Sequence, residues 1–346
     1  MPHSFSLLIK PVSCDCNLRC DYCFYTGKTE LFGHGRHLMP VSMLERLCAE
    51  YLSIPMDNHL FCWQGGEPTL AGLDFYRTAI ECMKRFGGPG VNVSNALQTN
   101  GILLNGDWGE FLAEYHFLVG VSIDGPPAIH NRFRHDASGK GSYNSVMAGI
   151  EVLRQHAVLF NALTVVNSHS AEHPLEIYRH LRDVLGVQYH QYIEETSGEL
   201  AVSARQWGDF LIAIFDEWFA HDQGRVSVRL FDSIMNKLET GNTDCCAMSS
   251  SCNQYLVIEH DGSIFPCDFH VMPIWCLGKV GETPLVSLFE KKLAHDFAMR
   301  KLPPPECRDC PYLNLCAADC PRNRLQDGKS RLCEGWKRFF SHCLGK

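Results

Sequence analysis

Three cysteines near the N-terminus have the spacing of a metal-binding loop. Cys16, Cys20 and Cys23 are separated by three and then by two residues. Thiolate sulfur favours zinc or iron-sulfur clusters, and a complete set has four ligands. Three converging thiolates therefore leave one metal position open for a molecule that reacts there.

A second motif is the glycine-rich turn Gly65-Gly66-Glu67-Pro68. Glycine has no Cβ, so the backbone can approach a ligand closely, and the Glu67 carboxylate can bind the ammonium group of an amino acid. Taken alone, the same four residues are also compatible with a plain β-turn. The turn indicates a ligand-binding site only because of its position one βα unit after the cysteine loop.

The C-terminal third holds eight more cysteines at motif-like spacing, enough for two four-thiolate sets. They are Cys246, Cys252, Cys267, Cys307, Cys310, Cys316, Cys320 and Cys333. Such sets suit both iron-sulfur clusters and structural zinc, so two zinc sites remain an alternative. Most of the other seven cysteines are expected to be small apolar core residues. Cys14 and Cys245 adjoin candidate ligands.

Composition limits the class of protein. The chain has 346 residues, 45% of them hydrophobic and 20% charged, which predicts a folded globular protein with one large core and a smaller unit. A net charge of -8 argues against nucleic acid and acidic membranes as partners. The N-terminus lacks the layout of a signal peptide, and no apolar run reaches the ~18 residues needed to span a bilayer. These features predict a cytoplasmic protein, in which eighteen cysteines favour metal binding over disulfides.

Short apolar runs alternate with amphipathic helical periodicity, which predicts βα units. The six predicted strands are Phe5–Lys10, Leu60–Gln64, Val91–Gln98, Leu118–Ile123, Val158–Val166 and Val187–Ile193. The predicted helices between them include Ser42–Leu52, Leu73–Phe86, Tyr143–Gln155 and His173–Leu185. Apolar residues at helical spacing over 203–221 predict a core-facing helix, followed by a bridging segment, Val226–Leu238.

The motifs follow the first four strands in turn. The cysteine loop, Gly65–Pro68, Thr99–Gly101 and Asp124–Pro126 each come directly after a predicted strand. Active sites of βα barrels form at the C-terminal ends of the strands. We therefore predict an α/β fold, a partial (β/α)6 TIM-like barrel over residues 1–235, with a cysteine-rich domain over residues 236–346.

The cysteine loop, with the aromatic Tyr22 before its last cysteine, resembles that of radical S-adenosylmethionine enzymes. The resemblance implies a four-iron four-sulfur cluster that cleaves S-adenosylmethionine to a 5'-deoxyadenosyl radical. It also implies that Gly65, Gly66 and Glu67 bind the methionyl amino group. Ser122 and Arg134 correspond to family residues near the ribose and carboxylate, although a capping serine and a solvated arginine are equally compatible with the sequence. A zinc knuckle is the alternative for the cysteine loop.

The C-terminal cysteines resemble the SPASM extension of radical enzymes, which carries two auxiliary four-iron four-sulfur clusters. By that resemblance, one cluster takes Cys246, Cys252, Cys267 and Cys320. The other takes Cys307, Cys310, Cys316 and Cys333. The spacing alone does not determine this pairing.

Nearly the whole chain resembles the anaerobic sulfatase-maturating enzymes, which oxidise a cysteine or serine in a sulfatase polypeptide to Cα-formylglycine. The stretches that carry the resemblance include Leu8–Pro11, Cys23–Tyr25, Gln64–Leu73, Leu97–Gly101 and Pro266–Phe269. The family's reaction removes a Cβ hydrogen, a heteroatom proton and an electron from the target. The resemblance makes Asp268 the proton acceptor, whereas an aspartate bound to backbone amides in a hairpin is the alternative.

One segment, Glu194–Glu199, departs from the family pattern, so contacts to adenine stay unassigned there. The resemblance implies three four-iron clusters and S-adenosylmethionine as cofactors. Its expected partners are an unfolded or nascent sulfatase-like polypeptide and a flavodoxin or ferredoxin reductant, and we expect a monomer.

Two other functions are compatible with parts of the sequence. A radical maturase could form a thioether or carbon crosslink in a ribosomal peptide, but the first strand begins almost at once, and we expect no leader-binding domain ahead of it. A non-catalytic iron-sulfur electron-transfer protein, or a zinc-stabilised adaptor, would not need the Gly65–Pro68 turn.

Overall fold

The computed structural model describes residues 4–33, 35–294 and 296–346. The chain forms two compact units. The first comprises Met1–Val121, His135–Leu159 and Asn253–Ala298, and the second comprises Ser122–Arg134, Phe160–Cys252 and Met299–Lys346. Both units combine residues from before and after position 235. The domain division after residue 235 stays a prediction.

The strands are β1 Ser6–Lys10, β2 Asn58–Trp63, β3 Asn92–Thr99, β4 Leu118–Ser122, β5 Phe160–Val166, β6 Tyr189–Glu194, β7 Ser227–Val228, β8 Tyr255–Glu259, β9 Ser263–Phe265 and β10 Gly278–Lys279. The helices are α1 Thr29–Phe32, α2 Val41–Leu52, α3 Leu73–Phe86, α4 Gly106–Glu114, α5 Pro127–Phe133, α6 Tyr143–Gln155, α7 Pro174–Arg179, α8 Ala204–His221, α9 Arg229–Thr240, α10 Leu285–Ala294, α11 Asp296–Met299, α12 Leu313–Cys316 and α13 Cys333–Cys343.

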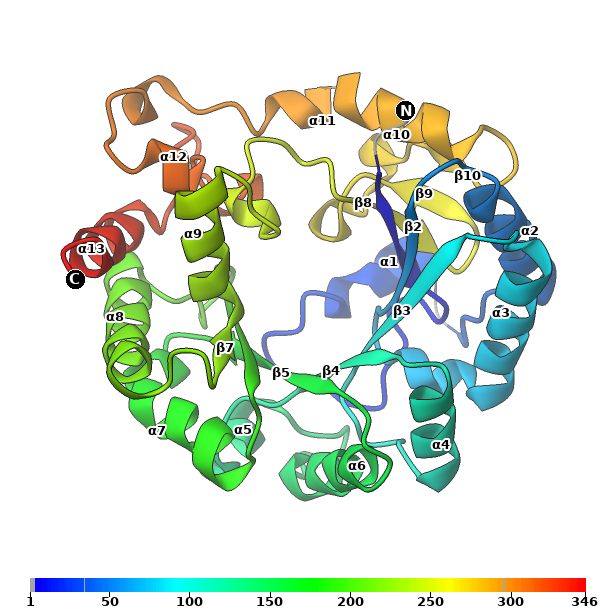
Figure 1. Cartoon of the computed structure of the whole chain (residues 1–346), viewed down its shortest axis with the longest axis horizontal. Coiled ribbons are helices and arrows are strands. Elements are labelled where there is room, and N and C mark those ends of the chain that lie inside the picture. The colour runs from blue at the N-terminus through cyan, green and yellow to red at the C-terminus, as the bar shows by residue number, and fades with distance from the viewer. Residues whose placement is uncertain (1–3, 34, 295) are drawn as a thin grey trace. The chain divides into compact units, whose positions relative to one another are not determined.

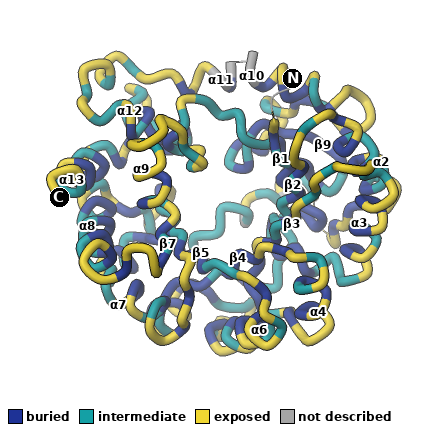
Figure 2. The backbone as a smooth tube through the Cα atoms, viewed as in Figure 1, coloured by how far each residue is buried: buried dark blue, intermediate teal, exposed yellow. Residues whose placement is uncertain are grey.

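In the first unit, strands β1 to β4 are parallel neighbours, and α2 and α3 cover one face of β1 to β3 (Figure 1). Leu7 and Ile9 of β1 and Phe61 of β2 are fully buried. Parallel strands are covered on both faces, so such apolar runs are expected in them. Figure 2 shows the same pattern, with exposed residues concentrated on the outer sides of helices and in loops. The parallel order places the C-terminal ends of β1 to β4 at one edge of the sheet.

Strand β8 lies on the other side of β1 and is parallel to it, with Lys10 opposite Glu259. The chain then turns back through β9. The turn between them is fixed by the Asp261 carboxylate, which accepts a hydrogen bond from Ser263 N at 2.9 Å, and by Gly262 at a φ of +81°. Strands β8 and β9 therefore form an antiparallel hairpin, which Cys267 and Asp268 follow directly.

In the second unit, β5, β6 and β7 are parallel neighbours. Helix α8 packs closely on α13 because both carry glycine at the crossing: a Cβ on Gly335 would lie 2.1 Å from the carbonyl oxygen of Ala204. Six apolar residues at helical spacing in the predicted helix are buried, which confirms that this helix faces the core. They are Trp207, Phe210, Leu211, Ile214, Phe215 and Trp218.

All six predicted strands are present, with each end shifted by at most two residues, and the α/β class is confirmed. The predicted helix over residues 173–185 is α7 followed by a π-helical turn, His180–Val184. The sequence analysis missed α4 and α5, two short helices. Asn105 caps α4 by accepting a hydrogen bond from Trp108 N at 3.1 Å. Within the described ranges, none of the helices has the length and apolar character to cross a membrane.

Candidate active site

The cysteine loop follows β1 and opens into a cavity of about 480 Å³. Cys16, Cys20 and Cys23 all line this cavity, together with Arg19 and Arg36. Cavities of this volume hold small-molecule ligands. The structure therefore brings the three predicted ligands to one space that has room for more than a metal.

The surroundings of Cys16 fit a metal-bound thiolate. The peptide N–H of Leu18 donates a hydrogen bond to Cys16 Sγ at 3.3 Å. Burial raises the pKa of the Cys16 thiol to about 12. A thiolate at this position consequently needs a positive partner, which iron supplies. Three thiols around one cavity fit an iron-sulfur cluster with one open iron.

The Gly65–Pro68 turn lies directly against the cysteine loop. Gly66 N donates to Ser13 O at 2.8 Å, and Glu67 N donates to Asp15 O at 2.7 Å. A Cβ on Gly66 would lie 2.1 Å from Asp15 O, and Gly65 has a φ of +123°. Only glycine allows the two loops to approach this closely. The backbone of the turn therefore packs directly against the backbone of the cysteine loop.

The Glu67 side chain is fully buried and links β2 to the end of β3. Oε1 accepts hydrogen bonds from Thr69 N at 3.0 Å, Thr69 Oγ1 at 2.6 Å and Thr99 Oγ1 at 2.7 Å. Oε2 accepts one from Asn100 N at 2.7 Å. Burial raises the pKa of Glu67 against the effect of these bonds. The carboxylate thus holds the turn in place, and a contact to an ammonium group would add to four existing bonds.

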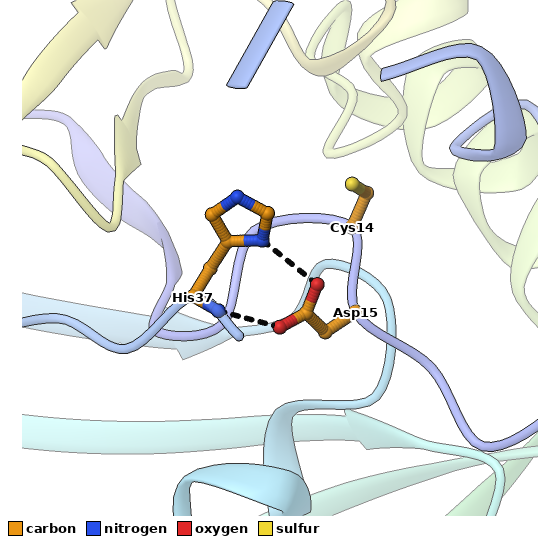
Figure 3. A group of neighbouring side chains, drawn as sticks. All are labelled: Cys14, Asp15 and His37. Carbon is orange, nitrogen blue, oxygen red and sulfur yellow. Dashed lines mark hydrogen bonds and ion pairs between the residues drawn. The ribbon is translucent and has the colours of Figure 1, made fainter. Parts of the chain in front are cut away.

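A cluster that the sequence analysis missed lies beside the loop: Cys14, Asp15 and His37 (Figure 3). The Asp15 carboxylate accepts from His37 N at 2.7 Å and pairs with His37 Nδ1 at 2.8 Å. His37 Nε2 lies 3.1 Å from Phe32 O. Burial acts to lower the pKa of His37, but its hydrogen bonds to Asp15 and Phe32 raise it above the ordinary value. Both ring nitrogens are engaged, so His37 links Phe32 to the cysteine loop.

Asp268 lies beside the same loops, because β8 and β9 return the chain to β1. Its Oδ2 accepts hydrogen bonds from Tyr25 Oη at 2.7 Å and from Gln64 Nε2 at 3.1 Å. Tyr25 follows Cys23 by two residues, and Gln64 precedes Gly65. One carboxylate therefore contacts both the cysteine-loop segment and the segment of the glycine turn, while 6% of Asp268 remains exposed.

Lys10, at the end of β1, is the buried cation of this region. Its ammonium forms ion pairs with Asp268 Oδ1 and, at 3.4 Å, with Glu259 Oε1. Burial acts to lower the pKa of Lys10, but the charges of Asp268 and Glu259 raise it. We did not single out Lys10, Glu259, Tyr25 or Gln64 from the sequence. One sequence feature could have pointed to Lys10: it is a lysine at the end of an apolar strand, immediately before the cysteine loop.

The cysteines of the second predicted auxiliary set come together in the second unit. Cys307, Cys310, Cys316 and Cys333 line one cavity whose other walls are largely apolar, including Trp336. Four thiols around a single cavity fit a four-thiolate group. The structure thus supports the grouping that the resemblance implied for this set.

The first predicted auxiliary set draws on both units. Cys246, Cys252 and Cys320 belong to the second unit and Cys267 to the first. The backbone before Cys320 is strained: Ala317, Ala318 and Asp319 have φ values of 47°, 57° and 61°. Non-glycine residues in this region cost on the order of 1–3 kcal/mol each and cluster at functional sites.

The remaining predicted contacts to S-adenosylmethionine come from three different segments. Tyr22 is half-buried in the cysteine loop, Ser122 ends β4, and Arg134 follows α5 and is 7% exposed. Their roles toward S-adenosylmethionine stay predictions. In the Glu194–Glu199 segment, Thr196 Oγ1 donates to Asn323 Oδ1 at 2.9 Å, so this segment packs against the loop after Cys320.

Comparison with protein families places this geometry in a known class. Residues 11–181 match the radical SAM superfamily, and residues 246–311 match an iron-sulfur cluster-binding domain named SPASM. The class is that of radical S-adenosylmethionine oxidoreductases, whose cofactors are four-iron four-sulfur clusters and S-adenosylmethionine.

Individual relatives narrow the class. The chain is 35% identical to the serine-type anaerobic sulfatase-maturating enzyme of Bacteroides thetaiotaomicron, over 97% of this chain and 88% of the relative. It is also 35% identical to the cysteine-type enzyme of Clostridium novyi, over 99% and 96%. A solved structure described as native anSMEcpe with bound AdoMet and Cp18Cys peptide matches with a TM-score of 0.91 at 33% identity, over 99% of this chain and 97% of that one. The chain belongs to the anaerobic sulfatase-maturating enzymes.

Metal content tests the proposed ligand sets. If each of the three sets carries a four-iron cluster, anaerobically reconstituted protein should hold about twelve irons per chain, and a variant with Cys16, Cys20 and Cys23 changed to Ala about eight. Iron and zinc would be measured together by elemental mass spectrometry. Zinc in place of eight of the irons would contradict the two auxiliary clusters.

The affinity for S-adenosylmethionine, measured without the polypeptide substrate, tests the role of Glu67. In Glu67→Gln the carboxamide nitrogen would face donors instead of accepting from them, so the turn should loosen. We expect S-adenosylmethionine to bind more weakly by ~1.5–3 kcal/mol, with full iron content. Calorimetry under anaerobic conditions measures the affinity, and Glu81→Gln, on the exposed face of α3, is the matched control. Wild-type affinity in Glu67→Gln would show that the turn does not support the cofactor.

Proposed function

We propose which residues of this chain carry out the reaction of its family, the oxidation of a cysteine or serine in a sulfatase polypeptide to Cα-formylglycine. In this proposal Cys16, Cys20 and Cys23 hold the cluster that works with S-adenosylmethionine, and Asp268 is the base. When bound, these cofactors and the auxiliary clusters supply the radical that removes the Cβ hydrogen and the acceptor for the released electron.

The observation that carries the proposal is the position of Asp268. Its carboxylate contacts Tyr25 and Gln64, so it lies between the cysteine-loop segment and the glycine-turn segment. A target side chain whose Cβ is attacked there would have its heteroatom within reach of the carboxylate. Oxygen accepts a proton at hydrogen-bond distance, and this completes the loss of one hydrogen atom, one proton and one electron.

The neighbours of Asp268 keep it in place for this step. Lys10 pairs with Oδ1, while Tyr25 and Gln64 donate to Oδ2. Three contacts from β1, the cysteine loop and β2 fix the carboxylate before the target arrives. Such preorganisation lowers the cost of orienting the base. The alternative role, a hairpin aspartate bound to backbone amides, is filled by Asp261.

For the partners, we propose an unfolded or nascent sulfatase-like polypeptide as substrate and a flavodoxin or ferredoxin as reductant, acting on a cytoplasmic monomer. A peptide is bound in the solved structure of the similar anSMEcpe, which supports a polypeptide segment as substrate. An anaerobic assay tests the reaction directly: peptides carrying a sulfatase motif with either cysteine or serine are incubated with the reconstituted enzyme, S-adenosylmethionine and a reductant. Mass spectrometry should find formylglycine in at least one of the two. 5'-Deoxyadenosine without any formylglycine would contradict the proposed substrate.

Replacing the base separates proton transfer from radical formation. Asp268→Asn keeps the shape but removes basicity, so formylglycine formation should fall by about 10²-fold or more, while iron content and cleavage of S-adenosylmethionine persist. Both products are quantified by mass spectrometry in one reaction. Asp261→Asn, in the turn between β8 and β9, is the control and should retain the activity. A wild-type yield of formylglycine in Asp268→Asn would move the base to another residue.

A further inference from the structure

Only three lysines are fully buried among the described residues: Lys10, Lys292 and Lys301. Lysine is almost never fully buried unless it is paired. Lys10 pairs with Asp268, the residue after Cys267. Lys292 donates to Tyr255 O at 2.6 Å, and the Tyr255 hydroxyl lies 3.5 Å from Cys267 Sγ. Lys301 belongs to the second unit, and it lies beside the loops that carry the other predicted ligands of the first auxiliary set, Cys246, Cys252 and Cys320.

Lys301 joins two loops that carry predicted ligands. Its ammonium donates to Ala247 O at 2.8 Å, in the loop between Cys246 and Cys252, and to Asp319 O at 2.7 Å, immediately before Cys320. Its side chain reaches the 246–252 loop and the 316–320 loop at the same time. These are the only three predicted ligands of that set in the second unit.

The acceptor at Asp319 belongs to the strained segment of three left-handed residues. A second cation holds the same segment: Arg324 Nε donates to Ala318 O at 3.1 Å. Lys237, on α9, donates to Met248 O and, at 3.2 Å, to Leu315 O, just before Cys316. Cations from three different elements thus bind the carbonyl groups around the predicted ligands. Because a carbonyl group carries no net charge, these hydrogen bonds do not neutralise the positive charge of the cations.

The charges that face Lys301 are the Cys252 and Cys320 sulfurs and the Asp319 carboxylate, with the Arg324 guanidinium as a second cation. The Asp319 carboxylate is engaged elsewhere: Oδ1 accepts from Cys320 N at 2.6 Å, and Oδ2 accepts from Ser330 Oγ at 2.6 Å. These neutral donors leave the negative charge of Asp319 in place, and a cluster bound to the cysteines would add a second anion beside Lys301. A four-iron cluster with four thiolates is an anion, and charges near a cluster set its reduction potential.

We propose that Lys301 is a positioning residue for the first auxiliary cluster. It ties together the loops that carry Cys246, Cys252 and Cys320, and its ammonium raises the reduction potential of the cluster. Reduction makes the anion more negative, so a nearby positive charge in a low-dielectric interior stabilises the reduced state. This inference rests on the proposed ligand set and goes beyond it, because it assigns the electrostatic control of the electron acceptor to a residue that is not a ligand.

The test uses protein that lacks the first cysteine loop, with Cys16, Cys20 and Cys23 changed to Ala, so that only auxiliary clusters contribute. Lys301→Gln keeps two hydrogen-bond donors and removes the charge, whereas Lys301→Arg keeps the charge. Iron content is measured first, and then a redox titration is followed by electron paramagnetic resonance. Lys140→Gln, an exposed lysine of the first unit, is the matched control.

In Lys301→Gln, the ratio of reduced to oxidised cluster at the parent's midpoint should fall about tenfold for one auxiliary couple, a shift of ~59 mV to lower potential. Lys301→Arg and Lys140→Gln should keep the parent's potentials. Loss of about four irons in Lys301→Gln, but not in Lys301→Arg, would also support the inference, since the charge would then be needed for assembly.

Two results would overturn the role of Lys301 while leaving the ligand set intact: unchanged iron and unchanged potentials in Lys301→Gln, or equal iron loss in Lys301→Gln and Lys301→Arg. A third result would distinguish failure of the ligand set from failure of the role of Lys301. If the parent lacking the first loop already contains no iron, the ligand set itself fails, and the inference fails with it.

Discussion

The ion pairs of Lys10 connect Asp268, the proposed base, to the sheet. Lys10 ends β1, Glu259 is its register partner on β8, and Asp268 follows β9. Removing one partner from such a buried pair leaves an uncompensated charge and typically costs 3–5 kcal/mol. The three side chains therefore fix one register between β1 and β8. That register delivers Asp268 to the C-terminal end of β1, where the cysteine loop begins.

The glycine turn depends on the same end of the sheet. Gly66 and Glu67 donate to carbonyl groups of the cysteine loop, and the Glu67 carboxylate is held by Thr69, Thr99 and Asn100. The ends of β1, β2 and β3 are thereby linked by hydrogen bonds that all pass through one short turn. A substitution that shifts the backbone of one loop should also shift the other loop, because the two backbones are in van der Waals contact.

Local signals predicted the parts of the site that lie within one βα unit. The cysteine spacing, the glycine turn and helices such as Leu73–Phe86 depend on residues close in sequence, and the structure places them as expected. The pairing of β1 with β8 joins segments about 250 residues apart, and no periodicity announces such a pairing. The contacts of Lys10, Tyr25 and Gln64 with Asp268 follow from that pairing, so sequence patterns alone could not supply them. The importance of Asp268 came from the family resemblance instead.

The buried lysines also explain how a chain with a net charge of -8 can accommodate anionic groups in its interior. Most of the negative charge lies on exposed carboxylates, where water screens it. Lys10 and Lys292 in one unit, and Lys301 in the other, instead lie where screening is weak and where the proposed ligands or their neighbours converge. Lys10 meets carboxylates, and its charge is balanced by the protein itself. Lys301 donates instead to the neutral carbonyl oxygens of Ala247 and Asp319. The two lysines thus differ in their partners, since Lys10 is paired with carboxylates whereas Lys301 binds backbone carbonyl groups.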